Sequence, residues 1–267
     1  MKQIFCMLSK TNRTVFLIAF LLSTLISLSQ PVEKISFSSL NTGDDYEIII
    51  RKPKAFDSSK YYHIVFFTDA SLNSGKNILG LADSIISHCI LIGIGHIGDY
   101  VMRRQRDFIP SDGGGYHNNE FGQASKFYLF FKNELMPFID QRIHNQKTRV
   151  FIGHSFGGLL ALYFSLKENK LFDQYYAISP SVWANHQELL KIEEMYKDKH
   201  DSYDATIYLY AGSLEIFNKV LGSTTRFYHI VTKRGYKNLS IYYQEIAWAN
   251  HFATVHKVIR GIFQELK

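Results

Sequence analysis

Alternating runs of apolar and polar residues predict a chain in which strands and helices follow one another. Short runs rich in β-branched and aromatic residues predict strands at residues 32–40, 46–51, 61–68, 89–94, 147–152, 172–179, 206–211 and 239–246. Apolar positions spaced three and four residues apart predict helices at residues 79–87, 121–143, 188–196 and 252–266, and another directly after residue 158. His229 and His256 also fall within helical patterns.

This alternation predicts an α/β fold of one domain, with a mostly parallel central sheet covered by helices on both faces. The run at residues 61–68 is apolar throughout, as expected of a strand buried on both faces. Pro137 predicts an interruption in the helix at residues 121–143. Residues 95–116 have no clear period and are predicted to form an irregular loop. No linker divides residues 30–267 into two domains.

The first 29 residues have the pattern of an export signal. Three cations within the first 13 residues precede an uncharged apolar run at residues 15–28, and Ser27 and Ser29 suit cleavage by signal peptidase. The sequence therefore predicts that residues 1–29 are a signal peptide and that the exported chain, periplasmic or secreted, begins at Gln30. An uncleaved membrane anchor is the alternative, although the run is short for one.

Composition narrows the possible functions. The chain has 267 residues, is 46% apolar and has a formal charge of +6. Because three cations lie in residues 1–29, which contain no acidic residue, the remainder carries only +3, and no nucleic-acid partner is expected. The glycines at residues 113–115 lack the features of a phosphate-binding loop, and neither a metal nor a cofactor is expected. Cys89 lies in an apolar run and is predicted to be a small core residue, not a nucleophile.

The strongest chemical motif is the glycine-rich turn at residues 153–158, which reads GHSFGG between a predicted strand and a predicted helix. This strand–turn–helix setting is the one that a G-x-S-x-G nucleophile elbow requires. Glycines on both sides of Ser155 permit a sharp turn that exposes its hydroxyl. The N–H of Phe156 would then face a developing oxyanion. An ordinary strand-to-helix turn with an unreactive serine is the alternative.

A serine nucleophile needs a base and an acid that orients the base, and both can be placed at the same edge of the sheet. His251 follows the last predicted strand, and Glu215 follows the strand at residues 206–211. Their order in the chain after Ser155, acid and then histidine, is that of the α/β-hydrolases. The alternatives are a structural histidine and a glutamate at a helix N-terminus. The second oxyanion donor is expected in the loop after residue 68, from the N–H of Ser71 or Ala70.

At these residues the chain resembles the esterase branch of the α/β-hydrolases that contains esterase D-like enzymes and siderophore trilactone esterases. The resemblance extends from about residue 32 to the C-terminus. It rests on FFTD at residues 66–69, RRQRDFIP at 103–110, GHSFGG at 153–158, SPSVW at 179–183, GSLE at 212–215, and His251. Ala70 departs from the glycine that many relatives have after the aspartate. The resemblance implies that residues 30–267 are an α/β-hydrolase domain with esterase activity.

The substrate is predicted from two further sets of side chains. Arginines in the predicted loop after residue 94 could pair with an anionic ester, and tryptophans after two strands could offer aromatic faces to it. These residues are Arg103, Arg104, Arg106, Trp183 and Trp248. Ferric catecholate siderophores are the leading example. The alternative pairs the arginines with Asp107 and other acids and packs both tryptophans in the core.

Three functions therefore stay open. The first is an exported serine ester hydrolase that acts on a small-molecule ester and meets the membrane only through its export segment. The second is an acyltransferase with the same machinery, which product analysis with an added alcohol would distinguish. The third is a binding protein without turnover, against which the presence of Ser155, Glu215 and His251 argues. The oligomeric state is not predicted.

Overall fold

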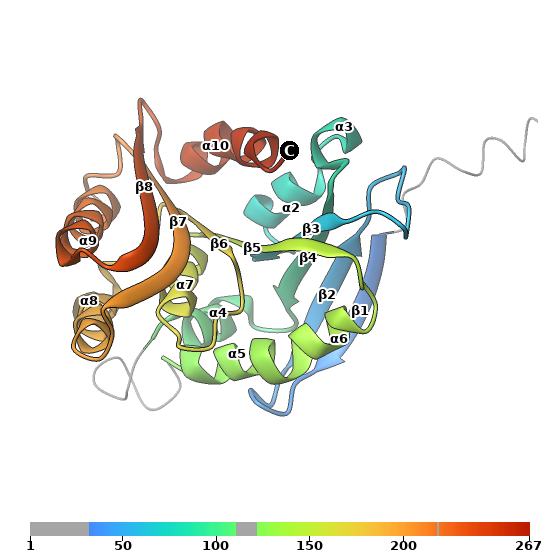
Figure 1. Cartoon of the computed structure of the whole chain (residues 1–267), viewed down its shortest axis with the longest axis horizontal. Helices are drawn as coiled ribbons and strands as arrows, with labels where there is room; N and C mark the ends of the chain where they lie inside the picture. Colours follow the sequence, from blue (N-terminus) through green and yellow to red (C-terminus); the bar gives the residue numbers. More distant parts are fainter. Residues whose placement is uncertain (1–31, 111–121, 218) are drawn as a thin grey trace, which may run out of the picture. The chain divides into compact units, whose positions relative to one another are not determined.

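The computed structural model describes residues 32–110, 122–217 and 219–267, which form an eight-stranded sheet with helices on both faces (Figure 1). The predicted signal peptide and the glycines at residues 113–115 lie outside the described residues. In chain order the strands are β1 (Val32–Ser38), β2 (Asp45–Arg51), β3 (Tyr62–Thr68), β4 (Cys89–His96), β5 (Gln146–His154), β6 (Gln174–Ile178), β7 (Ser202–Gly212) and β8 (Lys237–Ile246). All eight overlap predicted strands.

The strand order across the sheet is β1-β2-β4-β3-β5-β6-β7-β8. Strand β2 is antiparallel to β4, whereas each neighbouring pair from β4 to β8 is parallel. The chain therefore steps from β3 to β4 in one direction and then returns to place β5 on the other side of β3. Ligands of open α/β sheets bind outside the carboxyl ends of the strands at such a reversal. The loops that follow β3 and β5 are consequently the expected walls of a binding site.

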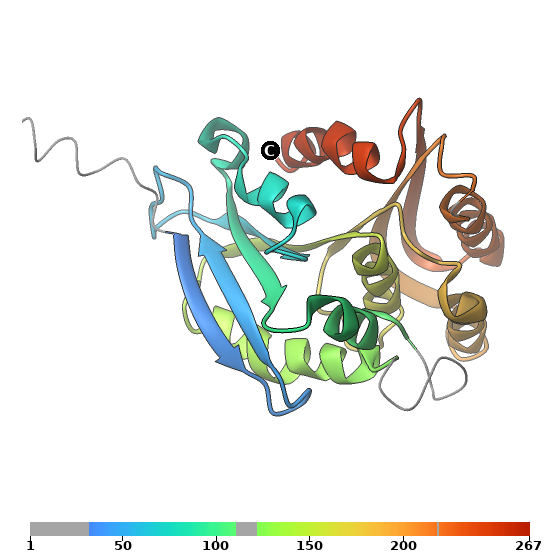
Figure 2. The same ribbon diagram turned by 180° about the vertical axis from the view of Figure 1, so that it is seen from behind.

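Two sets of helices cover the two faces of the sheet (Figures 1 and 2). The first set, α2 (Asn73–Leu79), α3 (Asp83–Ile86) and α10 (His251–Glu265), covers one face. The second set covers the other face and consists of α4 (Tyr100–Phe108), α5 (Ala124–Phe130), α6 (Met136–Asp140), α7 (Phe156–Ser165), α8 (Ala184–Lys197) and α9 (Val220–Arg234). Within the described ranges, no helix is long and apolar enough to cross a bilayer.

The central strands β3 and β4 are buried on both sides, as the sequence predicted, whereas the outer strands β1 and β8 are largely exposed. Every residue of β3 and of β4 is buried between the two helical layers. Cys89, the first residue of β4, is fully buried, and this burial raises the pKa of its thiol to about 12. Since the thiolate is the reactive form, the prediction of a core cysteine that is not a nucleophile is confirmed.

The helix predicted at residues 121–143 is interrupted near Pro137, as expected. It is divided into α5, a π-helical turn at Phe131–Leu135 and α6, with Pro137 in the first turn of α6. Proline has no N–H to donate to the preceding turn, so the chain accommodates it at the start of a new helical segment.

Two local predictions were wrong. Residues 95–116 were expected to be irregular, but α4 occupies Tyr100–Phe108, with the Asp99 carboxylate accepting the Met102 N–H at its start. Most of this helix is polar and only Asp107 and Phe108 are buried, so it has no apolar stripe to reveal it. One helix was expected at residues 79–87, whereas α2 ends at Leu79 before Gly80, and α3 is a separate short helix.

Candidate active site

Ser155 lies in the sharp turn between β5 and α7. Its φ of 61° and ψ of −118° are strained for a residue with a side chain, and its N–H donates to the carbonyl of Ile178 in β6. A Cβ on Gly153 would overlap the backbone of Gly157, so the close approach of strand and helix requires glycine there. The structure thus has the strand–turn–helix geometry of a nucleophile elbow, with Ser155 as the N-cap residue of α7.

His251 and Glu215 are joined by a short hydrogen bond, with 2.6 Å between Nδ1 of His251 and Oε1 of Glu215. Glu215 follows β7 and His251 begins α10, so both stand at the carboxyl edge of the sheet with Ser155. The imidazole is partly exposed and the carboxylate is buried. An Nδ1–H held by a carboxylate leaves Nε2 as the basic nitrogen of the ring.

The other oxygen of Glu215 is fixed by donors from three elements. Oε2 accepts hydrogen bonds from the Ser179 hydroxyl at 2.7 Å and from the Gly212 N–H at 2.6 Å, and Thr254 Oγ1 lies 3.5 Å away. Burial raises the pKa of Glu215, but the hydrogen bonds from His251, Gly212 and Ser179 outweigh it, so this pKa lies below its ordinary value. Glu215 is therefore ionised at neutral pH, as an acid that orients a histidine must be.

The Ser155 hydroxyl contacts a second serine. Its Oγ lies 3.4 Å from Oγ of Ser181, whose N–H also donates to the Ser155 carbonyl at 3.1 Å. Among the described residues no hydrogen bond joins Ser155 Oγ to the imidazole of His251. Ser179 and Ser181 were recognised in the sequence only as part of the SPSVW stretch and not as site residues. Their position after β6, at the same edge as Ser155, is the signal that could have identified them.

The backbone N–H groups predicted to form an oxyanion hole differ in their availability. Phe156 is the first residue of α7, where an N–H has no intrahelical acceptor. Ala70 donates its N–H to the carbonyl of Ile94 at 3.1 Å, which extends the pairing of β3 with β4. Of the two residues proposed from the sequence in this loop, Ser71 is therefore the one with an N–H not committed to the sheet.

Arg104 connects the two loops that contain these N–H groups. Its Nε and Nη2 each lie 2.9 Å from a carboxylate oxygen of Asp69, and Nη2 also donates to the His154 carbonyl at 3.1 Å. Asp69 is buried, has a φ of 61° and directly precedes Ala70, and its Oδ1 also accepts the Tyr100 hydroxyl at 2.5 Å. Arg104 thereby fixes the loop after β3 against the backbone beside Ser155.

The other two arginines predicted to bind substrate are also paired with acids of the chain. Arg103 lies 3.1 Å from Asp44, and Arg106 pairs with both Asp44 and Asp107, at 2.7 Å in the latter case. The arrangement matches the alternative considered from the sequence, in which nearby carboxylates balance these cations. These arginines reach the acids because α4 is a helix packed against β4, α5 and α7 and not a free loop.

Neither tryptophan is in the core, in contrast to the alternative considered for them. Trp183 is partly exposed, and its ring centroid lies 6.2 Å from that of Phe156, the residue after Ser155. Trp248 is 81% exposed in the turn between β8 and α10. Trp183 therefore provides an aromatic surface beside the nucleophile, whereas Trp248 projects into solvent on the side of His251.

His154, which the sequence placed beside Ser155 but gave no role, supports His251. The two imidazole centroids are 4.5 Å apart, and His154 Nε2 donates to the His251 carbonyl at 2.9 Å. Burial, together with the neighbouring His251, lowers the pKa of His154 to about 4. His154 is therefore neutral at physiological pH and adds no charge beside the candidate base.

Replacing His154 with glutamine is expected to make the protein less sensitive to acid. In the unfolded chain this histidine binds a proton below about pH 6.5, whereas in the folded chain its pKa is about 4. The folded state is therefore fully favoured above about pH 6.5 and loses stability as the pH falls from about 6.5 toward 4. Over that window, one histidine changes the free energy of unfolding by at most about 1.4 kcal/mol per pH unit. Chemical denaturation at several pH values would measure this slope, and identical slopes for both proteins would contradict the buried neutral state.

Replacing Arg104 with alanine is expected to lower kcat more than it raises KM. Without the guanidinium, the loop containing Ser71 is no longer held against Ser155, and kcat should fall by roughly 10- to 100-fold, less than the loss of a whole oxyanion donor. A lysine, which cannot form the paired contact, should restore only part of the rate. Arg103→Ala is the matched control, and thermal unfolding measures any loss of stability. A higher KM with unchanged kcat would instead indicate that Arg104 binds substrate.

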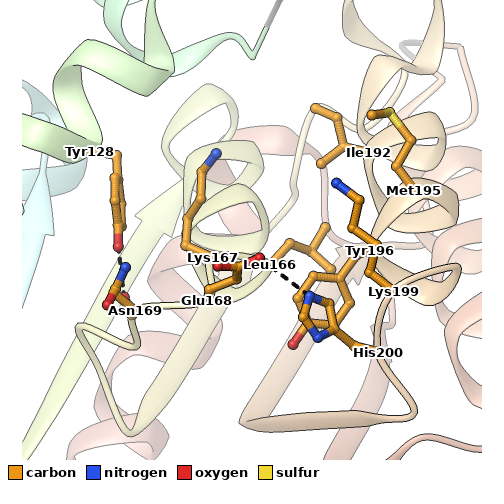
Figure 3. Close-up of a pocket in the computed structure, with 10 residues that line it drawn as sticks. All are labelled: Tyr128, Leu166, Lys167, Glu168, Asn169, Ile192, Met195, Tyr196, Lys199 and His200. Atoms are coloured by element: carbon orange, nitrogen blue, oxygen red, sulfur yellow. Dashed lines mark hydrogen bonds and ion pairs between the residues drawn. The ribbon is translucent and has the colours of Figure 1, made fainter.

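A cavity of about 290 Å³ lies away from this site, where α7 and α8 end (Figure 3). Its basic side chains are Lys167, which follows the end of α7, and Lys199 and His200, which follow the end of α8. Cations at helix C-termini are favoured by the helix dipole, which accounts for their presence. None of the residues predicted to form the active site lines this cavity.

Comparison with known proteins gives a family and a set of relatives. Residues 39–257 match the model of the family described as "Putative esterase". Ferri-bacillibactin esterase BesA of Bacillus subtilis is 28% identical over 202 residues, which span 68% of this chain and 70% of the relative. Siderophore enterobactin esterase of Emericella nidulans is 32% identical over 117 residues, 38% of each chain.

Solved structures agree with the fold. The BES protein of Bacillus cereus superposes with a TM-score of 0.73 at 22% identity and covers 90% of this chain and 97% of that one. An IroE-like serine hydrolase of Shewanella oneidensis gives a TM-score of 0.74 at 21% identity and covers 88% of this chain and 80% of that one. The α/β-hydrolase fold expected from the sequence is thereby confirmed. The chain belongs to the esterase family matched by residues 39–257, and it is an ester hydrolase.

Proposed function

We propose that the protein is an exported serine esterase that hydrolyses bulky aromatic esters through a covalent acyl-enzyme, with ferric siderophores as the leading substrates. The hydrogen bond of 2.6 Å between His251 and Glu215, at the sheet edge where the elbow presents Ser155, is the observation that supports it most. A neutral imidazole with its Nδ1–H on a carboxylate is the form that can accept a proton from a serine.

The reaction begins when Ser155 Oγ leaves Ser181 and approaches the imidazole of His251. Oγ bonds to the ester carbonyl carbon as Nε2 takes its proton, and the carbonyl oxygen becomes an oxyanion that the N–H groups of Phe156 and Ser71 stabilise. The imidazolium, stabilised by Glu215, then protonates the departing alkoxide. In the second half, water attacks the acyl group, His251 takes its proton and returns it to Oγ, and the carboxylic acid is released.

The substrate class rests on the relatives and on the surface beside Ser155. One curated relative is named as a ferri-bacillibactin esterase, and two others are named as siderophore esterases, of enterobactin and of triacetylfusarinine C. The rings of Phe156 and Trp183 lie next to the elbow and can contact an aromatic part of the substrate. Because nearby acids balance Arg103, Arg104 and Arg106, this aromatic surface is the stronger support for bulky aromatic esters.

The proposal is tested by comparing kcat/KM for a ferric trilactone siderophore, a feruloyl ester and a short acyl ester. We expect the trilactone to be preferred and Trp183→Ala to reduce that preference. The matched control is Met195→Ala, which removes an exposed apolar side chain from α8 far from Ser155. A preference for the short ester that Trp183→Ala leaves unchanged would reduce the protein to an esterase without this specificity.

The export part of the proposal predicts that the mature protein begins near Gln30. The cations of the N-terminal region, the apolar run at residues 15–28 and the small residues after it support cleavage there. Intact-mass measurement of protein purified from its native host should therefore lack residues 1–29. A mass that includes them would indicate a chain anchored by an uncleaved segment.

A further inference from the structure

Five large apolar side chains project into solvent beside the candidate active site. They come from the loop after β7 and from the turn and first helical residues after β8, and every one is at least half exposed. We call them the apolar rim: Leu214, Ile216, Phe217, Trp248 and Phe252. Contiguous exposed apolar surface on a soluble domain marks an interaction site more often than it marks chance.

The rim is a fixed feature, because the two chain segments that form it are tied together. Leu214 N–H donates to the Ala249 carbonyl at 3.1 Å, and Trp248 N–H donates to Ser213 Oγ at 2.9 Å. The segments after β7 and after β8 lie side by side in both ribbon views (Figures 1 and 2). The rim also borders the chemistry, since the ring of Phe252 lies 5.7 Å from that of His251.

Within the two loops that form the rim the exposed charges are positive, and the exposed Glu245 lies just before the second loop, at the end of β8. Residues 212–222 and 246–258 contain two lysines, Lys219 and Lys257, and both are exposed. The single acid within these two ranges is Glu215, which is buried and hydrogen-bonded to His251. Lys257 Nζ donates to the carbonyls of Ala247 and Trp248, so its cation lies directly behind the rim. An occupant that is apolar in its interior and anionic at its surface complements this arrangement.

The degree to which the rim side chains project favours a lipid surface over a protein partner or a small ligand. Phe217 is 97% exposed, so its ring projects away from the protein and does not line a cavity. A rigid protein partner would need a matching hole for each such side chain, whereas hydrocarbon chains flow around it. One small ester cannot cover five side chains spread over two loops. Exposed tryptophan and phenylalanine next to lysine are typical of residues that enter the interface of an anionic bilayer.

We propose that the apolar rim inserts into the surface of a bilayer containing anionic lipids and so holds the mouth of the catalytic site against the membrane. This contact is separate from the N-terminal export segment and does not depend on the proposed catalytic mechanism. It requires only that the rim residues leave water together while Lys219 and Lys257 remain near the headgroups.

A local fluorescent reporter tests the contact in the full chain, whatever the N-terminal segment does. The chain has two tryptophans, so Trp183→Phe leaves Trp248 as the single reporter in the rim. Vesicles of phosphatidylcholine and phosphatidylglycerol, at roughly 2:1, should shift its emission to the blue, and brominated lipids should quench it. Both the shift and the quenching should be smaller with vesicles of phosphatidylcholine alone. They should also be smaller with the anionic vesicles when salt is added to about 0.5 M.

Tyr61 provides the matched control. It is exposed and directly precedes β3, at the edge of the sheet opposite to the rim. Tyr61→Trp, in a chain with both natural tryptophans replaced by phenylalanine, should show no shift with the same vesicles. Adding Phe217→Ser to the Trp248 reporter chain should weaken vesicle binding by about tenfold or more, the loss expected when one buried phenylalanine is removed. Relative to the reporter chain, adding Phe217→Ser should not change hydrolysis of soluble p-nitrophenyl acetate.

Several results would overturn the proposal. Unchanged Trp248 emission with anionic vesicles would do so, as would an equal shift at Tyr61→Trp, which would indicate unspecific adsorption. If Phe217→Ser instead converts a dimer into a monomer, the rim is a contact between copies of the chain. If it raises KM for a bulky ester without lipid, the rim is a substrate surface. Because vesicle binding needs no turnover, these outcomes are independent of whether Ser155 is the nucleophile.

Discussion

Replacing Ser155 with alanine is expected to reduce kcat for ester hydrolysis by on the order of a million-fold, which is the typical loss when a triad nucleophile is removed. The acyl-enzyme cannot form without Oγ, and only the oxyanion hole and substrate binding are left to accelerate the reaction. Stability should change little, because the elbow strain lies in the backbone and the side chain makes one long contact, to Ser181. Release of p-nitrophenol from p-nitrophenyl acetate and thermal unfolding measure the two quantities.

Ser181→Ala is the control that makes this prediction specific. Ser181 Oγ lies 3.4 Å from Ser155 Oγ, so either serine could in principle react with a fluorophosphonate. We expect the reagent to modify Ser155, identified by mass spectrometry of peptides, and we expect Ser181→Ala to keep most of the activity. Labelling of Ser181, or hydrolysis at the wild-type rate by Ser155→Ala, would show that the elbow serine is not the nucleophile.

The parts of the site that could be predicted from the sequence are those set by chain topology. Carboxyl ends of parallel strands meet at one edge, so any residue that directly follows such a strand is expected there. Ser155, Glu215 and His251 each follow a predicted strand, and the structure places all three at that edge and joins two of them by a hydrogen bond. A motif of local spacing and a rule about strand ends together were sufficient to predict where these three residues lie.

The role of the arginines could not be predicted in the same way, because it depends on partners far away in the sequence. Arg103 and Arg106 pair with Asp44, about sixty residues earlier, and Arg104 pairs with Asp69. These contacts exist because α4 packs against β4, α5 and α7, which brings its arginines to Asp44 and Asp69, and α4 itself lacks an apolar stripe to reveal it. The sequence indicated that cations gather here, and only the structure shows which acids balance them.

The exposure of the apolar rim could not be predicted from the sequence either. Leu214, Ile216 and Phe217 fall in a segment of mixed apolar and polar residues for which no helix or strand was predicted, and Trp248 was weighed as a core residue. In the structure Gly212 and Ala249 take the buried positions of the two loops, which leaves the larger side chains outside. Hydrophobicity alone does not distinguish a core residue from one that a partner or a bilayer covers.

Replacing His251 with alanine is expected to be as damaging as losing Ser155, whereas Glu215→Gln should be milder. His251 moves the proton in both halves of the reaction, so the serine without it is an ordinary alcohol, and kcat should fall by about a million-fold. The matched control is His256→Ala, an exposed histidine on the same helix, which should keep full activity. Steady-state kinetics on p-nitrophenyl acetate measures all three variants. Substantial turnover by His251→Ala would move the base elsewhere.

Glu215→Gln should lower kcat by on the order of a thousand- to ten-thousand-fold and also destabilise the fold, because neither orientation of the amide satisfies its neighbours. With the amide oxygen on His251 Nδ1–H, the amide NH₂ faces the Gly212 N–H, which is also a donor. With the groups exchanged, the NH₂ meets Nδ1 and forces the wrong tautomer on the base. An unsatisfied buried donor costs about 1–3 kcal/mol, which denaturant unfolding would detect. Full activity with unchanged stability would mean that Glu215 does not orient the histidine and that Ser155 and His251 act as a dyad.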